Sequence, residues 1–320
     1  MNRIIAYVVS TAILISCMGS SADARKDKWP FKEMVTVSCV NFTPITGDKA
    51  VTLAKIKDFT VKAARQGANI IVFPELALVG IPKPADVSKI AEPIPGPSTQ
   101  EIAKLAKEHN VFVIFGMIEE QGTTFYNAAA VVGPGGIMGA QHKVHPIAFM
   151  EPWAAKGKEY KLFETPYGPI GIGICYSTYC FPETARCYAA RGARLFLKPT
   201  AFPEFPDCSD FKEFYMTVLG TRAIENSMFV ASSNMVGMVG GYPFFGYSGI
   251  FGPKPGYMSY QMFAGPATEK KEAIVTASLN LKSLEYLPDA VSTILEDRNP
   301  EMYKCLVAPV ATGLQNTDKK

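Results

Sequence analysis

Short apolar runs alternate with amphipathic stretches along most of the chain, and this alternation predicts the class of fold. Runs of strand length predict buried strands over residues 35–40, 70–73, 111–117, 127–132, 137–142, 170–175, 195–198, 228–233, 246–251 and 273–279. Apolar residues at helical spacing predict helices over residues 48–66, 99–109, 183–191 and 210–225. Strands that alternate with helices, without a break in composition, predict one α/β domain.

Composition narrows the classes of function. The chain has 320 residues, of which 48% are hydrophobic, enough for a sizeable core in one large domain or two small ones. Its formal net charge is only +3 and no block of Lys and Arg occurs. Nothing in the sequence therefore predicts a nucleic-acid surface.

The N-terminus has the pattern of a targeting segment. Residues 4–15 are apolar but too few to span a bilayer comfortably, and residues 22–24 form an A-x-A cleavage site. This pattern predicts residues 1–24 as a signal peptide and an exported protein, either periplasmic or extracellular. Residues 14–17 also fit a lipoprotein box, which would leave a lipid anchor on Cys17. An uncleaved anchor helix is the remaining alternative.

Three residues carry chemistry that could work together. Cys175 ends the apolar run at residues 170–175, where a strand gives way to a helix. Glu75 ends a second apolar strand, and a carboxylate in such surroundings is rarely buried without a partner. Lys143 follows the hairpin around residues 133–136. A thiol, a carboxylate and an amine can together perform acyl transfer.

The order and surroundings of these residues resemble the nitrilase, or carbon–nitrogen hydrolase, superfamily. The glutamate motif matches residues 73–77 (FPELA), the lysine motif residues 142–145 (HKVH) and the nucleophile motif residues 173–176 (GICY). Agreement continues through residues 181–183, 199–201, 221–226 and 247–249, so the similarity covers residues 35–287. Each motif is weak alone, but their order along one chain is specific.

The resemblance implies a particular α/β architecture. It is a four-layer αββα sandwich, in which two sheets pack face to face with helices outside, and it would occupy residues 30–290. Residues 291–320 would form a C-terminal extension that packs on a partner subunit. A homodimer or larger assembly is expected, with pairing through the predicted helices at residues 183–191 and 210–225, which carry much apolar surface.

The resemblance also implies roles for the candidate residues. Cys175 would be the nucleophile, and Glu75 the base that takes its proton. Lys143, with a backbone N–H such as that of Tyr176, would stabilise the negative charge on the substrate oxygen. Glu151 matches a second glutamate that the family often places beside the nucleophile.

Substrate contacts are expected from Tyr176, Trp153, Thr200 and Ala201, and the proline-rich connection at residues 79–98 is expected to shape the entrance. One departure from the family pattern concerns these substrate contacts. Many family members carry Asp two residues after the cysteine, where this chain has Ser177. Nearby Cys180 competes for the role of nucleophile, but it does not directly end the strand.

The expected activity is that of a thiol amidase acting on a small carboxamide, with no metal and no organic cofactor. A nitrilase, an N-carbamoyl hydrolase and a non-catalytic binding module on the same fold remain alternatives. A zinc site at Cys175, Cys180 and Cys187 is disfavoured, because structural zinc sites use closer cysteine pairs.

Overall fold

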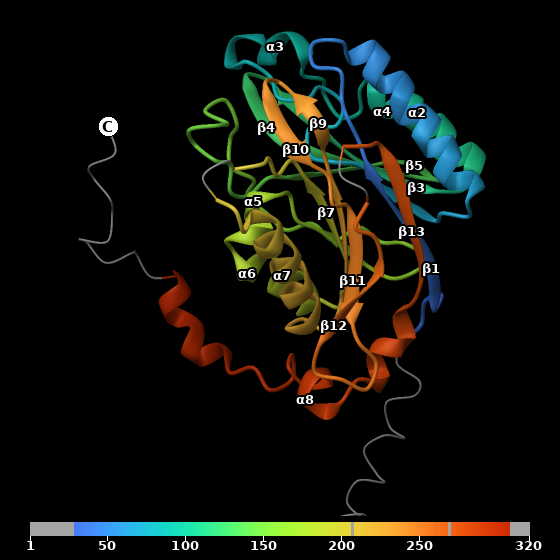
Figure 1. The fold of residues 1–320 in the computed structure, drawn as a ribbon, viewed down its shortest axis with the longest axis vertical. Coiled ribbons are helices and arrows are strands. Elements are labelled where there is room, and N and C mark those ends of the chain that lie inside the picture. The colour runs from blue at the N-terminus through green and yellow to red at the C-terminus, as the bar shows by residue number, and fades with distance from the viewer. Residues whose placement is uncertain (1–28, 206–207, 268–269, 308–320) are drawn as a thin grey trace, which may run out of the picture.

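A six-stranded sheet forms one half of the core in the computed structural model, which describes residues 29–205, 208–267 and 270–307. Its strand order is β13–β1–β2–β3–β4–β5, and Figure 1 labels β1, β3, β4, β5 and β13 of this sheet. The central strands β1, β2 and β3 are parallel, and the outer pairs are antiparallel. The strands are β1 Met34–Asn41, β2 Ile70–Val72, β3 Phe112–Gln121, β4 Thr124–Gly133, β5 Gly136–His142 and β13 Ala273–Asn280.

A five-stranded sheet packs against the first, with contacts from β7 and β8 to β1, β2 and β3. Its order is β12–β11–β8–β7–β6, with β6, β7 and β8 parallel. The strands are β6 Ile170–Ile172, β7 Leu195–Thr200, β8 Phe229–Asn234, β11 Gly249–Pro253 and β12 Tyr260–Ala264. A separate hairpin pairs β9 (Val236–Val239) with β10 (Tyr242–Phe245).

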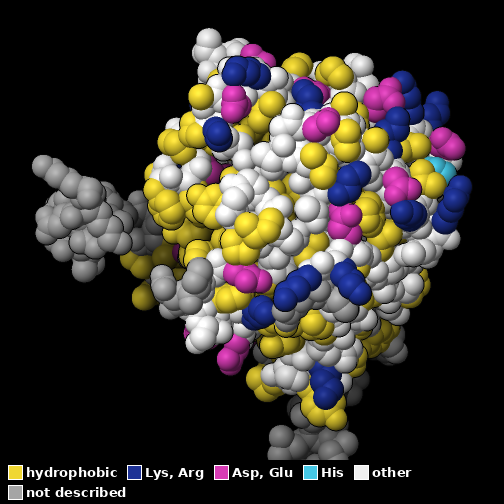
Figure 2. All heavy atoms as spheres, turned by 45° about the horizontal axis from the view of Figure 1, so that its top comes forward, with side chains coloured by type: hydrophobic (Ala, Val, Ile, Leu, Met, Phe, Trp, Pro, Cys, Tyr) yellow, Lys and Arg dark blue, Asp and Glu magenta, His cyan; other side chains and the backbone are white. Residues whose placement is uncertain are grey.

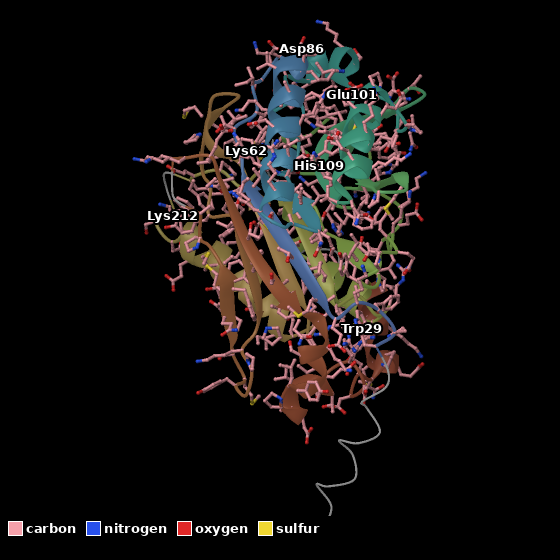
Figure 3. The ribbon with its side chains drawn as sticks, turned by 90° about the vertical axis from the view of Figure 1, so that its right-hand side faces the viewer. Trp29, Lys62, Asp86, Glu101, His109 and Lys212 are labelled. Atoms are coloured by element: carbon pink, nitrogen blue, oxygen red, sulfur yellow. The ribbon has the colours of Figure 1, made fainter. Side chains whose placement is uncertain are left out.

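Helices cover the outer face of each sheet. The pair α2 (Lys49–Arg65) and α4 (Pro97–His109) lies over the six-stranded sheet, and Figure 3 shows the two side by side. On the other side lie α6 (Pro182–Ala189) and α7 (Phe211–Ile224), together with the short α5 (Tyr176–Tyr179). The order helix, sheet, sheet, helix confirms the predicted four-layer αββα sandwich.

Successive residues of the six-stranded sheet belong to two different cores. Ile70 and Val72 of β2 pack in the core shared with the five-stranded sheet, whereas Ile71 packs under α2 and α4. Ile56 of α2 and Ile102 of α4 complete this second core. Side chains of a strand point alternately to opposite faces. Because both faces are covered, the central strands are continuous apolar runs.

Parallel strands bring two predicted site residues to the ends of their sheets. Glu75 follows the carboxyl end of β2, and Cys175 follows the carboxyl end of β6. In open α/β sheets, ligands commonly bind outside these strand ends. Each sheet therefore carries one predicted site residue just beyond the carboxyl end of a parallel strand.

Some elements differ from those predicted. The proline-rich connection contains a 3-10 turn at Pro84–Asp86 and a short helix α3 at Val87–Ile90. The turn begins at Pro84, whose ring fixes a helical φ. The helix begins at Val87, which is buried. The β9–β10 hairpin and strand β12 were not predicted. The strand expected at residues 246–251 begins only at Gly249, because Gly246 and Tyr247 have positive φ.

The C-terminal part packs on the core before it turns away. Within the 3-10 helix Leu281–Tyr286 and helix α8 (Asp289–Ser292), Leu284 and Val291 are buried. The next helix, Pro300–Val307, is exposed and stands apart from the sheets (Figure 1, red). The predicted signal peptide at residues 1–24 lies outside the described residues, as do residues 308–320.

The surface carries mixed charge. Figure 2 shows basic and acidic side chains interspersed with apolar ones over the face in view. Among the described residues, no helix combines the length and the apolar character that crossing a membrane requires.

The homodimer or larger assembly stays a prediction, but part of the apolar surface expected on α6 and α7 is buried within the chain. Tyr188 of α6 and Tyr215 and Leu219 of α7 are buried inside this chain, because they pack on its own sheet. Phe214 of α7 is exposed.

Replacing Gly116 of β3 by alanine is expected to destabilise the fold. A Cβ at this position would collide with the backbone of Glu75 and Leu76, which cannot move without shifting the strand end. Overpacking of this kind typically costs about 1–3 kcal/mol. Chemical denaturation of Gly116→Ala should show this loss in the free energy of unfolding. Gly135→Ala is the matched control, since its Cβ would meet open space; equal stability of both variants would contradict the packing argument.

Candidate active site

Cys175 occupies a strained turn between β6 and α5. Its φ of 44° and ψ of −113° lie in a region that residues with a side chain rarely adopt. The Cys175 N–H donates to the Pro199 carbonyl at 2.9 Å, and its own carbonyl accepts from the Thr178 N–H at 2.9 Å. Backbone strain of this kind concentrates at functional sites, where the surrounding structure holds it in place. The turn therefore fixes the direction of the thiol.

Gly173 allows this turn to pack closely on β7. A Cβ at Gly173 would collide with the ring of Phe196 and be 2.5 Å from the Thr178 hydroxyl oxygen. The glycine in the nucleophile motif is therefore explained by the close approach of the neighbouring strand.

Lys143 lies between two carboxylates in the interior. Its Nζ is 2.6 Å from Glu75 Oε1 and 2.6 Å from Glu151 Oε2. Lys143 is only 2% exposed, and Glu75 and Glu151 are 3% and 7% exposed. A buried ammonium needs such partners, because its transfer from water is strongly unfavourable. The structure thus brings together three of the four predicted catalytic residues in one ionic cluster.

Asn127 joins the two carboxylates and was not predicted from the sequence. Its side-chain N–H groups donate to Glu75 Oε1 at 2.8 Å and to Glu151 Oε1. Its position in the strand β4, within an otherwise apolar run, is the signal that could have identified it. Backbone amides complete the cluster, with Ala201 N–H donating to Glu75 Oε2 at 3.0 Å and Ile147 N–H to Glu151 Oε2 at 2.9 Å.

The charges of this cluster act on both Lys143 and Cys175. Burial disfavours the charged form of Lys143, but Glu75 and Glu151 outweigh it and raise its pKa above the ordinary value. Burial, with the nearby Glu75 carboxylate, raises the pKa of the Cys175 thiol to about 11. Lys143, Lys198 and a hydrogen bond from Thr200 act in the opposite direction. The fourth predicted residue is therefore electrostatically part of the cluster.

The predicted substrate-binding residues have different surroundings. Tyr176 follows Cys175, is partly exposed, and contacts Phe181 edge to face. Trp153 is partly buried against the core under α2 and α4. Thr200 is fully buried, and the amide of Ala201 already holds Glu75. Tyr176, Trp153 and Ala201 are thus partly exposed, whereas Thr200 is not.

Cys180 lies at the far end of α5 and is exposed, apart from the buried cluster. Within the parts of the chain that the structure describes, no group of three or more His, Cys, Asp and Glu is placed to hold a metal ion.

Comparison with known proteins identifies the class. The sequence profile of the carbon–nitrogen hydrolase family matches residues 36–289. The chain is 31% identical over 280 residues to a Schizosaccharomyces pombe protein named as a probable nitrilase. The aligned region covers 85% of this chain and 98% of that protein. It is 31% identical over 268 residues to the omega-amidase NIT2 of Homo sapiens, and that region covers 80% of this chain and 92% of the omega-amidase.

The solved structure of a mutant amidase of the nitrilase superfamily from Nesterenkonia AN1 has a similar fold. The TM-score is 0.72 and the sequence identity is 21%. The superposition covers 88% of this chain and 100% of the amidase chain. This similarity supports the αββα architecture.

The chain belongs to the carbon–nitrogen hydrolase family. It is accordingly a hydrolase of C–N bonds other than peptide bonds. The predicted superfamily is confirmed, and the omega-amidase among its relatives agrees with the amidase-like branch.

Lys143→Met is expected to destabilise the protein strongly, because it leaves two buried carboxylates without their ammonium. Breaking a buried pair by removing one partner typically costs about 3–5 kcal/mol. Since the folded pKa of Lys143 is raised, the stabilisation it provides is present below the ordinary lysine value of 10.5 and is lost only as the pH rises through the higher folded value. Unfolding measured from neutral to alkaline pH should show a constant deficit that shrinks only above 10.5.

The matched control is Lys104→Met, whose partner Glu101 is on the surface of α4. Solvent screens such a pair, so little change is expected. A Lys143→Met variant as stable as this control would show that the buried cluster does not need its cation.

Proposed function

We propose that this protein is an exported thiol hydrolase, which cleaves the C–N bond of a small carboxamide through a cysteine thioester and releases ammonia or an amine. The observation that carries the proposal is the buried cluster of Lys143, Glu75 and Glu151 beside Cys175 at its strained turn. These groups supply the nucleophile, the base and the oxyanion contact that acyl transfer needs.

Attack on the amide needs a base in the same step. With its pKa raised to about 11, the thiol of Cys175 is protonated at neutral pH. Glu75 is suited to take this proton, since its Oε2 accepts the Ala201 amide and retains a lone pair. As sulfur bonds to the carbonyl carbon, the electron pair of the C=O bond moves to oxygen. Lys143 and the backbone N–H of Tyr176 then stabilise that charge.

The intermediate collapses when Glu75 returns the proton to the leaving nitrogen and the C–N bond breaks. A thioester on Cys175 remains. Water attacks the thioester while Glu75 takes its proton. The C–S bond then breaks, Glu75 returns the proton to the sulfur, and the acid and the free thiol are released. Glu151 holds Lys143 in place throughout. The steps draw on side chains of this chain and on water, without a metal or an organic cofactor.

Nitrile hydrolysis is a second candidate. The similarity to the S. pombe protein named as a probable nitrilase favours it. An amide is the preferred substrate because Tyr176 and Ser177 follow the nucleophile, where nitrilases of this superfamily usually carry Trp-Glu.

Cys175→Ala should abolish ammonia release, because it removes the nucleophile and leaves the rest of the cluster intact. The measurement is ammonia release by purified protein from panels of small amides, N-carbamoyl compounds and nitriles. Cys180→Ala is the matched control and should retain wild-type rates, since its thiol is exposed outside the cluster. Activity in Cys175→Ala would overturn the assignment, and release from nitriles alone would favour the second candidate.

Export is part of the proposal and rests on the sequence of residues 1–24. Mass spectrometry of the protein recovered from cells should find an N-terminus at Arg25, after cleavage at the A-x-A site, or a lipid on Cys17. An intact N-terminus on protein from the cytoplasm would refute export while leaving the hydrolase proposal untouched.

A further inference from the structure

A second buried lysine lies near the nucleophile and has no part in the steps above. Lys198 is in β7, between β6 and β8 in the five-stranded sheet, and it is fully buried. The apolar residues around it in the strand predict a core position, so a cation here is unexpected.

Lys198 has polar and aromatic neighbours instead of a carboxylate partner. Its Nζ donates to the Thr200 hydroxyl at 2.9 Å and lies 3.2 Å from the centroid of the Tyr179 ring. Within the described residues no carboxylate forms an ion pair with it. The charged or titratable groups whose fields act on it are Cys175, Glu75, Lys143 and Arg222. Tyr215 also presents its ring, at 5.6 Å.

The balance of these groups is unfavourable to the ammonium in the resting site. Burial lowers the pKa of Lys198 to about 7, and the positive charges of Lys143 and Arg222 add to the fall. The thiol of Cys175, once ionised, and Glu75 act in the opposite direction. The groups that favour a charged Lys198 are thus the nucleophile and its base.

Thr200 connects the lysine to the sulfur. A hydroxyl can accept two hydrogen bonds and donate one. The Thr200 oxygen accepts from Lys198 and is 3.2 Å from the Tyr179 hydroxyl, which can donate to its second lone pair. The Thr200 hydrogen is then available to Cys175, where a hydrogen bond from Thr200 favours the thiolate.

We propose that Lys198 is a positioning residue of this site, whose ammonium orients the Thr200 hydroxyl and stabilises the thiolate of Cys175. The inference rests on the proposed function for its purpose, but thiolate formation can be measured without turnover. In this scheme Lys143 serves the substrate oxygen, and Lys198 serves the sulfur.

The test is alkylation of Cys175 by iodoacetamide as a function of pH, followed on the Cys175 peptide by mass spectrometry. Lys198→Met keeps the length of the side chain and removes its charge, so the thiolate loses its stabilisation near neutral pH, where Lys198 is still partly protonated. The rate at neutral pH should fall by about tenfold, since one pKa unit is a tenfold change in thiolate. Lys198→Arg keeps the charge and should retain part of the rate.

Lys254→Met is the matched control, because Lys254 also lies over a tyrosine ring, that of Tyr257 at 4.0 Å, but far along the chain from the site. Its alkylation profile should equal that of the wild type. A melting curve establishes that each variant is folded, and Lys198→Met is expected to melt no lower than the wild type, since an unpaired buried charge is replaced by an apolar chain.

Thr200→Val provides an independent arm should Lys198→Met not fold. It removes the connecting hydroxyl and should lower the alkylation rate at neutral pH by a smaller factor. Wild-type alkylation profiles in folded Lys198→Met or, failing that, in Thr200→Val would overturn the inference. Absence of ammonia release by the wild type, with the fall in alkylation rate present in the variants, would refute the amidase proposal alone.

Discussion

The candidate site depends on keeping one ammonium, that of Lys143, charged in the interior. Burial alone would favour its neutral form, and two carboxylates within 2.6 Å reverse that preference. The three charges come from segments after β2 and β5 and from the loop that carries Glu151. Asn127 of β4 then ties both carboxylates together. The charges can balance only when the six-stranded sheet has its native register, so the stability of the sheet and the geometry of the site are coupled.

Two buried lysines near one thiol are held in opposite ways. Lys143 has two carboxylate partners and its pKa is raised, whereas Lys198 forms no carboxylate ion pair among the described residues and its pKa is lowered to about 7. The first lysine is a permanent charge at neutral pH. The second responds to the charge of its neighbours, and the nearest group that changes charge in the proposed reaction is Cys175. One fold thus combines a fixed cation with a responsive one.

Much of this architecture could be predicted from local patterns. The strands that become the centres of both sheets are short apolar runs, and Glu75 and Cys175 were identified because each ends such a run. The layer order followed from a resemblance rather than from the pattern, since periodicity does not say which sheet a strand joins. Strand β12, only partly buried, lacked the apolar run that marked the others.

The residues that the sequence did not reveal act through partners distant in the chain. Asn127 is an ordinary polar residue until the fold brings Glu75 and Glu151 to it. Lys198 is likewise one charge in an apolar strand, and only the three-dimensional structure places it over Tyr179. The motifs identified the groups that are proposed to react, whereas the groups that hold them depend on packing.

The end of β7 links Cys175 to Glu75, its proposed base, across the two sheets. The carbonyl of Pro199 accepts the Cys175 N–H, the hydroxyl of Thr200 favours the thiolate, and the amide of Ala201 holds Glu75. Cys175 belongs to the same sheet as this segment, but Glu75 follows a strand of the other sheet. Three consecutive residues therefore set the position of the thiol relative to the carboxylate. A small slip between the sheets would separate Cys175 from Glu75, so the packing of the sandwich core is itself a condition for the proposed chemistry.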